Sequence, residues 1–71
     1  MFVVYAIKSL SRNYIYVGMS NNIERRLSQH NNGESKTTKA YKPFVLILLE
    51  EFESRIEARK REIYLKSGIG K

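Results

Sequence analysis

Three apolar segments separated by polar ones predict three strands. Residues 2–8 are rich in β-branched and aromatic side chains, which is typical of a strand buried on both faces. Residues 14–19 alternate tyrosine or glycine with aliphatic side chains, so a second strand is expected to present its tyrosines on one face. The polar segment 9–13 between them is short, which favours antiparallel pairing. Residues 44–52 follow a proline and begin with six apolar side chains, which predicts the most buried strand.

Two further segments carry helix signals. Asn21 has glutamate three positions later, in capping-box spacing, and an Asn-Asn-Gly sequence ends a helix predicted at about residues 22–31. Ser54 has the same spacing to a glutamate and starts a second helix, predicted at residues 54–67 and stopped by a glycine. Its apolar side is expected to consist of Ile56, Ala58, Ile63 and Leu65.

The order strand, strand, helix, strand, helix predicts the α/β class. We expect residues 1–71 to form one small α/β sandwich, in which helices flank a three-stranded, mainly antiparallel sheet. A chain this short buries only about 60% of its unfolded surface. It has no cysteine, so neither a disulfide nor a thiolate metal site supports the core. The polar, basic segment 33–42 is predicted to be a loop suited to phosphate contacts.

The charge of the chain favours a phosphate-containing partner. Thirteen lysines and arginines against seven acids give a net charge of +6 and a pI of about 9.8. Basic side chains that simply solvate helix faces are an equally good explanation from charge alone. No apolar run approaches the roughly 20 residues that span a bilayer, and the start of the chain lacks the features of a signal peptide. We therefore expect a cytoplasmic protein with no membrane partner.

The inventory of reactive side chains excludes several kinds of site. One histidine, no cysteine and no aspartate rule out a histidine- and cysteine-rich metal cluster and a Ser-His-Asp triad. The four glycines form no phosphate-cradling loop. The tyrosines, arginines, histidine and glutamates that remain suit phosphodiester hydrolysis. That reaction needs a base for water, cationic stabilisation of the phosphate charge and help for the leaving oxygen. A carboxylate can hold one Mg²⁺ ion that acts as a Lewis acid on a phosphate oxygen.

Five short segments together resemble the GIY-YIG nuclease domain, in the small stand-alone bacterial form related to the amino-terminal nuclease domain of the excision-repair endonuclease. Residues 3–5 (Val-Val-Tyr) and 16–18 (Tyr-Val-Gly) match the two motifs that name the family, although the first has lost its glycine. The other matches are residues 24–30, 39–44 and 57–66. Many relatives continue further and carry a late asparagine that has no counterpart here.

The resemblance implies a role for each candidate site residue. Tyr5 and Tyr16 would flank the scissile phosphate, and either could serve as the base. Arg26 would bind the phosphate, and His30 would assist proton transfer or contact the phosphate. Glu62 would ligate one Mg²⁺ or Mn²⁺ ion. The residues implied in substrate binding are Gly18, Lys39 and Lys42.

Two of these residues have a structural explanation as well. Glu62 is spaced along its helix to form ion pairs with Arg59 and Lys66. Gly18 can be a turn or bulge residue at a strand end, or it can allow backbone or ligand to come close. The sequence leaves both alternatives open.

The predicted function is a metal-dependent endonuclease that acts on nucleic acid, DNA more than RNA, with a connection to DNA repair. The alternatives are a non-catalytic or weakly active nucleic-acid-binding domain, and a protein-interaction domain whose charge is incidental. The nuclease hypothesis predicts that the five catalytic candidates converge on one concave face. It also predicts that both tyrosine hydroxyls are partly open to solvent.

Overall fold

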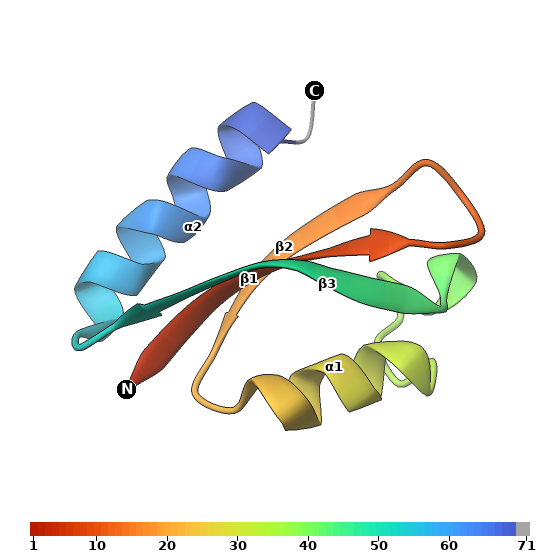
Figure 1. The fold of residues 1–71 in the computed structure, drawn as a ribbon, viewed down its shortest axis with the longest axis horizontal. Coiled ribbons are helices and arrows are strands. Elements are labelled where there is room, and N and C mark those ends of the chain that lie inside the picture. Colours follow the sequence, from red (N-terminus) through yellow and green to blue (C-terminus); the bar gives the residue numbers. More distant parts are fainter. Residues whose placement is uncertain (70–71) are drawn as a thin grey trace.

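The computed structural model describes residues 1–69, with side chains to residue 68, as an α/β sandwich (Figure 1). Its elements are β1 (Phe2–Ser9), β2 (Ile15–Ser20), α1 (Ile23–Asn31), a short 3₁₀ helix (Lys39–Tyr41), β3 (Phe44–Phe52) and α2 (Arg55–Ile69). The predicted order and fold class are therefore confirmed, and the segment predicted to be a loop contains the 3₁₀ helix. Neither α-helix in the described part of the chain is long and apolar enough to cross a membrane.

The sheet has the order β2-β1-β3, and both pairings are antiparallel. In the central strand, Tyr5 lies opposite Gly18 of β2 and Leu49 of β3. Helix α1 lies on one side of the sheet and α2 on the other (Figure 1). Because successive side chains of a strand point to opposite faces, neighbouring residues of β1 belong to two separate cores.

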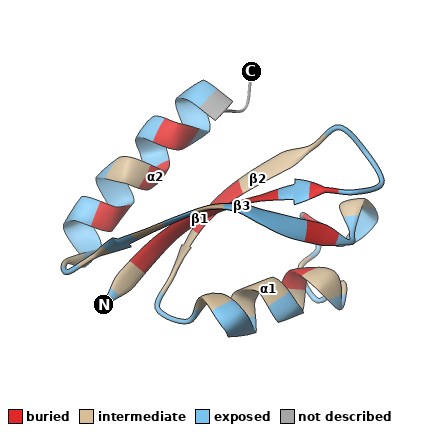
Figure 2. Cartoon of the chain, viewed as in Figure 1, coloured by how far each residue is buried: buried red, intermediate tan, exposed pale blue. Residues whose placement is uncertain are grey.

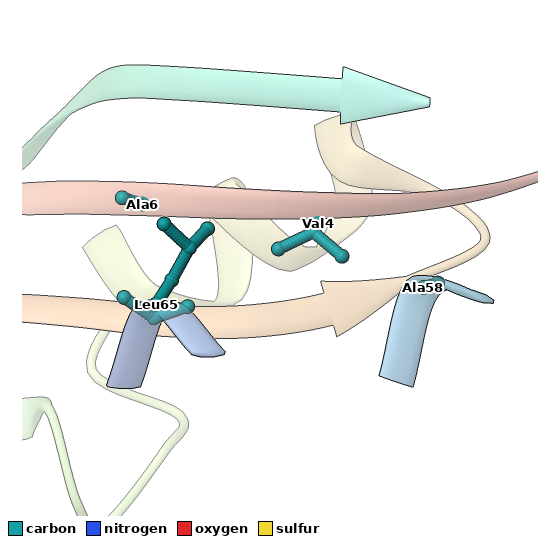
Figure 3. Packing of buried hydrophobic residues seen from close by; sticks show 5 residues of the cluster. Val4, Ala6, Ala58 and Leu65 are labelled. Carbon is teal, nitrogen blue, oxygen red and sulfur yellow. The ribbon is translucent and has the colours of Figure 1, made fainter. Parts of the chain in front are cut away.

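The core beneath α2 consists of small and aliphatic side chains. Val4 and Ala6 of β1 pack with Val17 of β2, and Ala58 and Leu65 of α2 close over them (Figure 3). The two alanines are fully buried and carry only a methyl group, so helix and sheet come close together. This face is a packing surface.

The core beneath α1 is aromatic. It is built on Tyr5, Ile7 and Phe44, with partly buried tyrosines from β2 and the 3₁₀ helix around them. The Asn31 side chain at the end of α1 holds the start of β3, since its Oδ1 accepts from the Phe44 amide at 2.6 Å and its Nδ2 donates to the Phe44 carbonyl at 3.3 Å. Side-chain bonds thus fasten the end of α1 to the sheet.

The start of α1 differs from the prediction by one residue. Asn22, and not Asn21, is the N-cap, and its side chain accepts a hydrogen bond from the Arg25 amide at 3.1 Å. Three adjacent polar residues, 20–22, are all suitable caps, so local sequence does not distinguish among them. The predicted cap of α2 is confirmed, because the Ser54 hydroxyl accepts from the Glu57 amide.

The prediction that residues 44–52 form the most buried strand is wrong. Strand β3 lies at the edge of the sheet, and four of its apolar side chains are 39–48% exposed: Val45, Leu46, Ile47 and Leu49. The buried strand is β1, which has a partner on either side (Figure 2). An apolar run reports the composition of a strand, whereas its burial depends on how many neighbours cover it.

The predicted apolar side of α2 is only half correct. Ala58 and Leu65 are buried as expected, but Ile56 and Ile63 are 69% and 54% exposed. The buried stripe runs through positions 58, 62 and 65, at helical i, i+4, i+7 spacing, and therefore includes Glu62. Hydrophobicity alone predicted a different buried side of α2, because it does not favour a carboxylate at a buried position.

This correction can be tested on stability. Leu65→Ala is expected to lower the free energy of unfolding by about 2–4 kcal/mol, because it opens a cavity between α2 and the sheet. Ile63→Ala, which removes a side chain of the same size from the exposed side, should cost less than about 1 kcal/mol. Urea denaturation followed by circular dichroism measures both. Equal losses would show that Ile63 is also packed.

Candidate active site

Four of the five catalytic candidates meet on the α1 side of the sheet. Tyr5 comes from β1, Tyr16 from β2, and Arg26 and His30 from α1. The ring centroids lie 6.4 Å apart for Tyr5 and Tyr16, 5.0 Å for Tyr16 and His30, and 6.0 Å for Tyr5 and His30. Segments up to 25 residues apart in sequence therefore form one cluster.

Regular secondary structure produces this grouping. Ile7 lies opposite Tyr16, so Tyr16 is a diagonal neighbour of Tyr5 on the same face of the sheet. Arg26 and His30 are four residues apart on α1 and so lie on one stripe, facing the two tyrosines. The strand period and the helix period together bring the four side chains together.

A chain of hydrogen bonds runs through the buried part of the cluster. The Tyr5 hydroxyl lies 3.0 Å from Nε2 of His30, and Nδ1 of His30 lies 2.8 Å from the Thr38 hydroxyl. All three residues are fully buried. Thr38 was not among the predicted site residues, because one threonine in a polar loop produces no periodic signal. The one available signal in the sequence is that Thr38 follows another threonine, Thr37.

Gly18 provides the space that the Tyr5 ring occupies. A Cβ atom at residue 18 would lie 2.5 Å from the Tyr5 hydroxyl oxygen and 3.0 Å from Cε2 of Tyr16. The sequence had left open whether this glycine ends a strand or allows a close approach. In the structure the group that comes close is the Tyr5 phenol, which packs directly over the glycine.

Burial and the Arg26 cation set the protonation of this cluster. Burial raises the pKa of Tyr5, and the neighbouring Arg26 guanidinium offsets part of that rise. Burial lowers the pKa of His30, and the positive charge of Arg26 acts in the same direction. The pKa of Arg26 is raised, chiefly by its hydrogen-bonding interaction with the Tyr5 phenol. At neutral pH the cluster therefore contains a neutral phenol, a neutral imidazole and a permanent cation.

The two tyrosines differ in exposure. Tyr16 is partly exposed, whereas Tyr5 has no exposed surface. The prediction that both hydroxyls are open to solvent is therefore wrong for Tyr5. The physical reason is the missing side chain at Gly18, since the hydroxyl end of the Tyr5 ring occupies the space that a Cβ atom there would take, and residues of α1 pack around the ring.

An open cleft of about 240 Å³ lies beside the cluster. Its lining consists of Arg26, Gln29, Glu34 and Ser35, which belong to α1 and the loop after it. The Arg26 guanidinium donates from Nη1 to Oε1 of Gln29 at 3.0 Å. Arg26 thus connects the buried phenol on one side with the cleft on the other. Gln29 was not predicted as a site residue either.

The predicted substrate-binding lysines lie in the loop between α1 and β3. Lys39 and Lys42 are both exposed, and side-chain carbons of each come within 3.6 Å of where a Cβ on Gly33 would stand. Gly33 has a φ of +75°, which a residue with a side chain rarely adopts. Within the described residues neither lysine forms an ion pair. Their charges remain available near the cleft.

Glu62 lies apart from the other four candidates, so the prediction that all five converge on one concave face is wrong for this residue. It belongs to α2, which covers the opposite face of the sheet, and its side chain is 8% exposed (Figure 1). Its oxygens contact Nη1 of Arg59 at 2.7 Å and Nζ of Lys66 at 3.3 Å. The helical ion pairs considered from the sequence are therefore present. The carboxylate is still near enough to the cluster that its charge is among the smaller causes raising the pKa of Tyr5, after burial.

Glu62 does not belong to a larger cluster of metal-binding side chains in the described part of the chain. Among the described residues no group of three or more histidine, cysteine or acidic side chains gathers. Mg²⁺ commonly binds one or two carboxylates and completes its shell with water and substrate phosphate, so one carboxylate fits this kind of ion. Arg59 and Lys66 have 61% and 50% exposed side chains and can turn to solvent to release it.

Comparison with known proteins agrees with this geometry. The family model described as "GIY-YIG catalytic domain" matches residues 1–70. The UPF0213 protein CPE1444 of Clostridium perfringens is 40% identical over 67 residues, which cover 93% of this chain and 71% of the relative. The UPF0213 protein SH2523 of Staphylococcus haemolyticus is 40% identical over 65 residues, which cover 90% and 78%.

A third relative is longer. The UPF0213 protein VPA1222 of Vibrio parahaemolyticus is 39% identical over 64 residues, which cover 89% of this chain and 59% of that protein. No solved structure gives a significant match. The match to the family model spans nearly the whole chain. The chain therefore belongs to the GIY-YIG catalytic domain family, with small bacterial UPF0213 proteins among its relatives.

Proposed function

We propose that this domain is an endonuclease that hydrolyses phosphodiester bonds in nucleic acid, DNA more than RNA, with the help of a divalent metal ion. The observation that carries the proposal is the position of Arg26. Its guanidinium lines an open cleft and also interacts with a buried phenol beside the second tyrosine. A fixed, permanent cation at the edge of a cleft suits a phosphate group.

Each residue of the cluster has a separate role in the proposed reaction. Arg26 binds the nonbridging oxygens of the scissile phosphate and stabilises the charge that develops on them in the transition state. Tyr16 is the partly exposed phenol, so it is the one that can orient or deprotonate the attacking water. Tyr5 is enclosed and neutral at physiological pH, and its role is to hold Arg26.

Glu62 would hold the Mg²⁺ or Mn²⁺ ion. When bound, such an ion would supply Lewis acidity to a phosphate oxygen. Glu62 would be free to hold it if Arg59 and Lys66 turned outward, as substrate phosphates near α2 would favour. The ion pairs seen in the free protein then keep the buried carboxylate from remaining an uncompensated charge.

The surface charge supports a nucleic-acid partner. The net charge of +6 and the exposed Lys39 and Lys42 provide contacts to phosphates beyond the scissile one. A cytoplasmic location and a part in DNA repair belong to the same proposal, and the resemblance to the excision-repair nuclease domain supports the second of them. Binding should weaken steeply with rising salt concentration.

Two observations favour a second function. Glu62 is engaged by two cations, and Tyr5 is closed to water. A domain that binds nucleic acid and cleaves it poorly or not at all would have both features. Metal-dependent nicking separates this alternative from the nuclease.

Replacing Glu62 with glutamine should therefore lower metal-dependent cleavage by at least about 100-fold, because the ligand that holds the ion loses its charge. The assay incubates the protein with supercoiled, branched and single-stranded DNA, and with RNA, with and without Mg²⁺ or Mn²⁺. Nucleic-acid binding should remain near the wild-type level.

The matched control is Glu57→Gln, which makes the same charge change at an exposed position of the same helix. It should cleave like the wild type. Wild-type cleavage by Glu62→Gln would show that Glu62 does not hold the metal. A wild-type protein that binds every substrate and nicks none would replace the nuclease with the binding function.

A further inference from the structure

One apolar run of the chain lies at an edge of the sheet. Residues 44–49 are all apolar, which is typical of a buried strand. In the structure β3 pairs with β1, and among the described residues no strand lies on its other side (Figure 1). A long, apolar edge strand offers unpaired backbone groups to another chain. The sequence pattern and the position of β3 therefore disagree, and a further strand beside β3 would reconcile them.

The open part of this edge begins at Val45. The Asn31 side chain bonds both backbone groups of Phe44, so the fold itself covers the edge at that residue. Residues 45–49 include neither the lysine nor the proline that protects many edge strands, and four of them are exposed (Figure 2). The bulge at Ile47 is a protective feature, yet the side chain that it exposes is apolar. Every residue of β2, at the other edge, is buried or partly buried, so β3 is the edge that offers apolar surface.

The two ends of β3 carry charges of opposite sign. Lys39 and Lys42 precede the strand, and Glu51 and Glu53 lie at its far end. All four residues are exposed, and none of them forms an ion pair within the described residues. Two antiparallel copies of β3 place the positive end of one beside the negative end of the other, whereas parallel copies bring like charges together. The strand is therefore complementary to itself in one direction.

We propose that β3 pairs antiparallel with β3 of a second copy of this chain, so that two three-stranded sheets become one. Leu46 lies opposite Ile7 of β1. Leu49 lies opposite Tyr5, so both leucines are on the α1 face of the sheet. Residues directly opposite in an antiparallel pair share a face, which sets Leu46 opposite Leu49 of the second copy.

This register also pairs the charged ends, because it sets Lys42 opposite Glu53 of the second copy. The contact is the same surface on both copies, so it closes at a dimer and leaves no β3 edge open. No residue of β3 is among those that line the cleft beside Arg26, and Lys39 stays available for phosphate. The inference is therefore independent of the proposed function and can fail without it.

Sedimentation velocity measures the association. With rising protein concentration the mass of the wild type should increase from 8.3 kDa towards twice that value and stop there. Ile47→Lys puts a charge in the middle of the paired edge and should hold the protein at the monomer mass. The matched control is Ile63→Lys, which makes the same change at a similarly exposed position of α2 and should associate like the wild type.

Cross-linking tests the register of the two strands. The chain has no cysteine, so introduced thiols have no competitor. Leu46→Cys and Leu49→Cys proteins should form a disulfide-linked dimer when they are mixed and oxidised, because directly opposite Cβ atoms lie about 4.5–5.5 Å apart. Each protein oxidised alone should cross-link far less, since neither position faces itself across the two-fold axis.

A wild type that stays at the monomer mass at every concentration would overturn the proposal and leave the edge to another segment or partner. Growth beyond two copies would also overturn it, because β3 would then pair with a different edge. The same holds if Ile47→Lys and Ile63→Lys associate equally, or if the cysteine variants cross-link as well alone as when mixed. Should circular dichroism show that Ile47→Lys does not fold, the wild-type mass and the cysteine pair decide.

Discussion

Arg26→Ala should lower the rate of nucleic-acid cleavage by about 100- to 1,000-fold, the range typical of removing one preorganised group that stabilises charge in the transition state. The guanidinium interacts with the Tyr5 phenol and hydrogen-bonds Gln29, so it is held in place before the substrate arrives. Preorganisation of this kind is lost completely with the side chain. Single-turnover cleavage with saturating metal and enzyme measures the effect.

Arg25→Ala is the matched control for this prediction. Arg25 is the adjacent residue of α1 and is exposed, so its replacement removes the same charge from the same helix. In both variants the slope of log binding constant against log salt concentration should become less steep, by the equivalent of about one phosphate contact at most. Only Arg26→Ala should lose cleavage. Equal loss in the two variants would mean that Arg26 contributes general positive charge and no specific stabilisation.

Arg26→Lys refines the same experiment. Lysine keeps the charge but has neither the planar fork of donors nor the reach to phenol and cleft at once. It is therefore expected to recover only a small part of the activity that Arg26→Ala loses. Full recovery would show that charge alone is required at this position.

Gly18→Ala should reduce the free energy of unfolding by about 3 kcal/mol, at the upper end of the usual cost of overpacking. The added Cβ would lie 2.5 Å from the hydroxyl oxygen and 2.7 Å from Cζ of Tyr5. Tyr5 is fully buried and bonded to His30, so its ring cannot move aside cheaply. In a domain of this size such a loss lowers the melting temperature by about 12–24 °C.

Gly68→Ala provides a control of opposite sign. Gly68 lies in α2, and a Cβ there would meet no atom within 4 Å. Alanine has the higher helix propensity, so this variant should be equal to the wild type or more stable by up to about 1 kcal/mol. Thermal and urea denaturation of both variants measure the difference. A Gly18→Ala protein as stable as the wild type would show that the Tyr5 ring does not lie over residue 18.

Much of the fold and of the candidate site follows from local patterns. Apolar runs, capping residues and turn residues are local, and they predict the order of the elements correctly. Period 2 in β1 and β2 and period 3.6 in α1 are enough to group Tyr5, Tyr16, Arg26 and His30 once the family motif aligns them. The ion pairs of Glu62 were also predictable, since they need only helical spacing.

The burial of each element was not predictable in this way. The apolar run of β3 is as hydrophobic as that of β1, yet only β1 has a strand on either side. In the same way Ile63 is more hydrophobic than Glu62, yet the position of α2 against the sheet buries the glutamate. Whether a side chain is buried depends on the elements packed around it, and the packing of the whole domain decides which elements those are.

The residue patterns predicted the family resemblance, the order of the elements and one shared site of five residues, four of which do lie together. Packing in three dimensions closes Tyr5 to solvent, brings Thr38 to the His30 ring and places Glu62 on the other side of the sheet. The reason is the range of the contacts. Strand and helix periods act over two to four residues, whereas Tyr5 meets His30 across 25 positions through an aromatic core that packs as a unit.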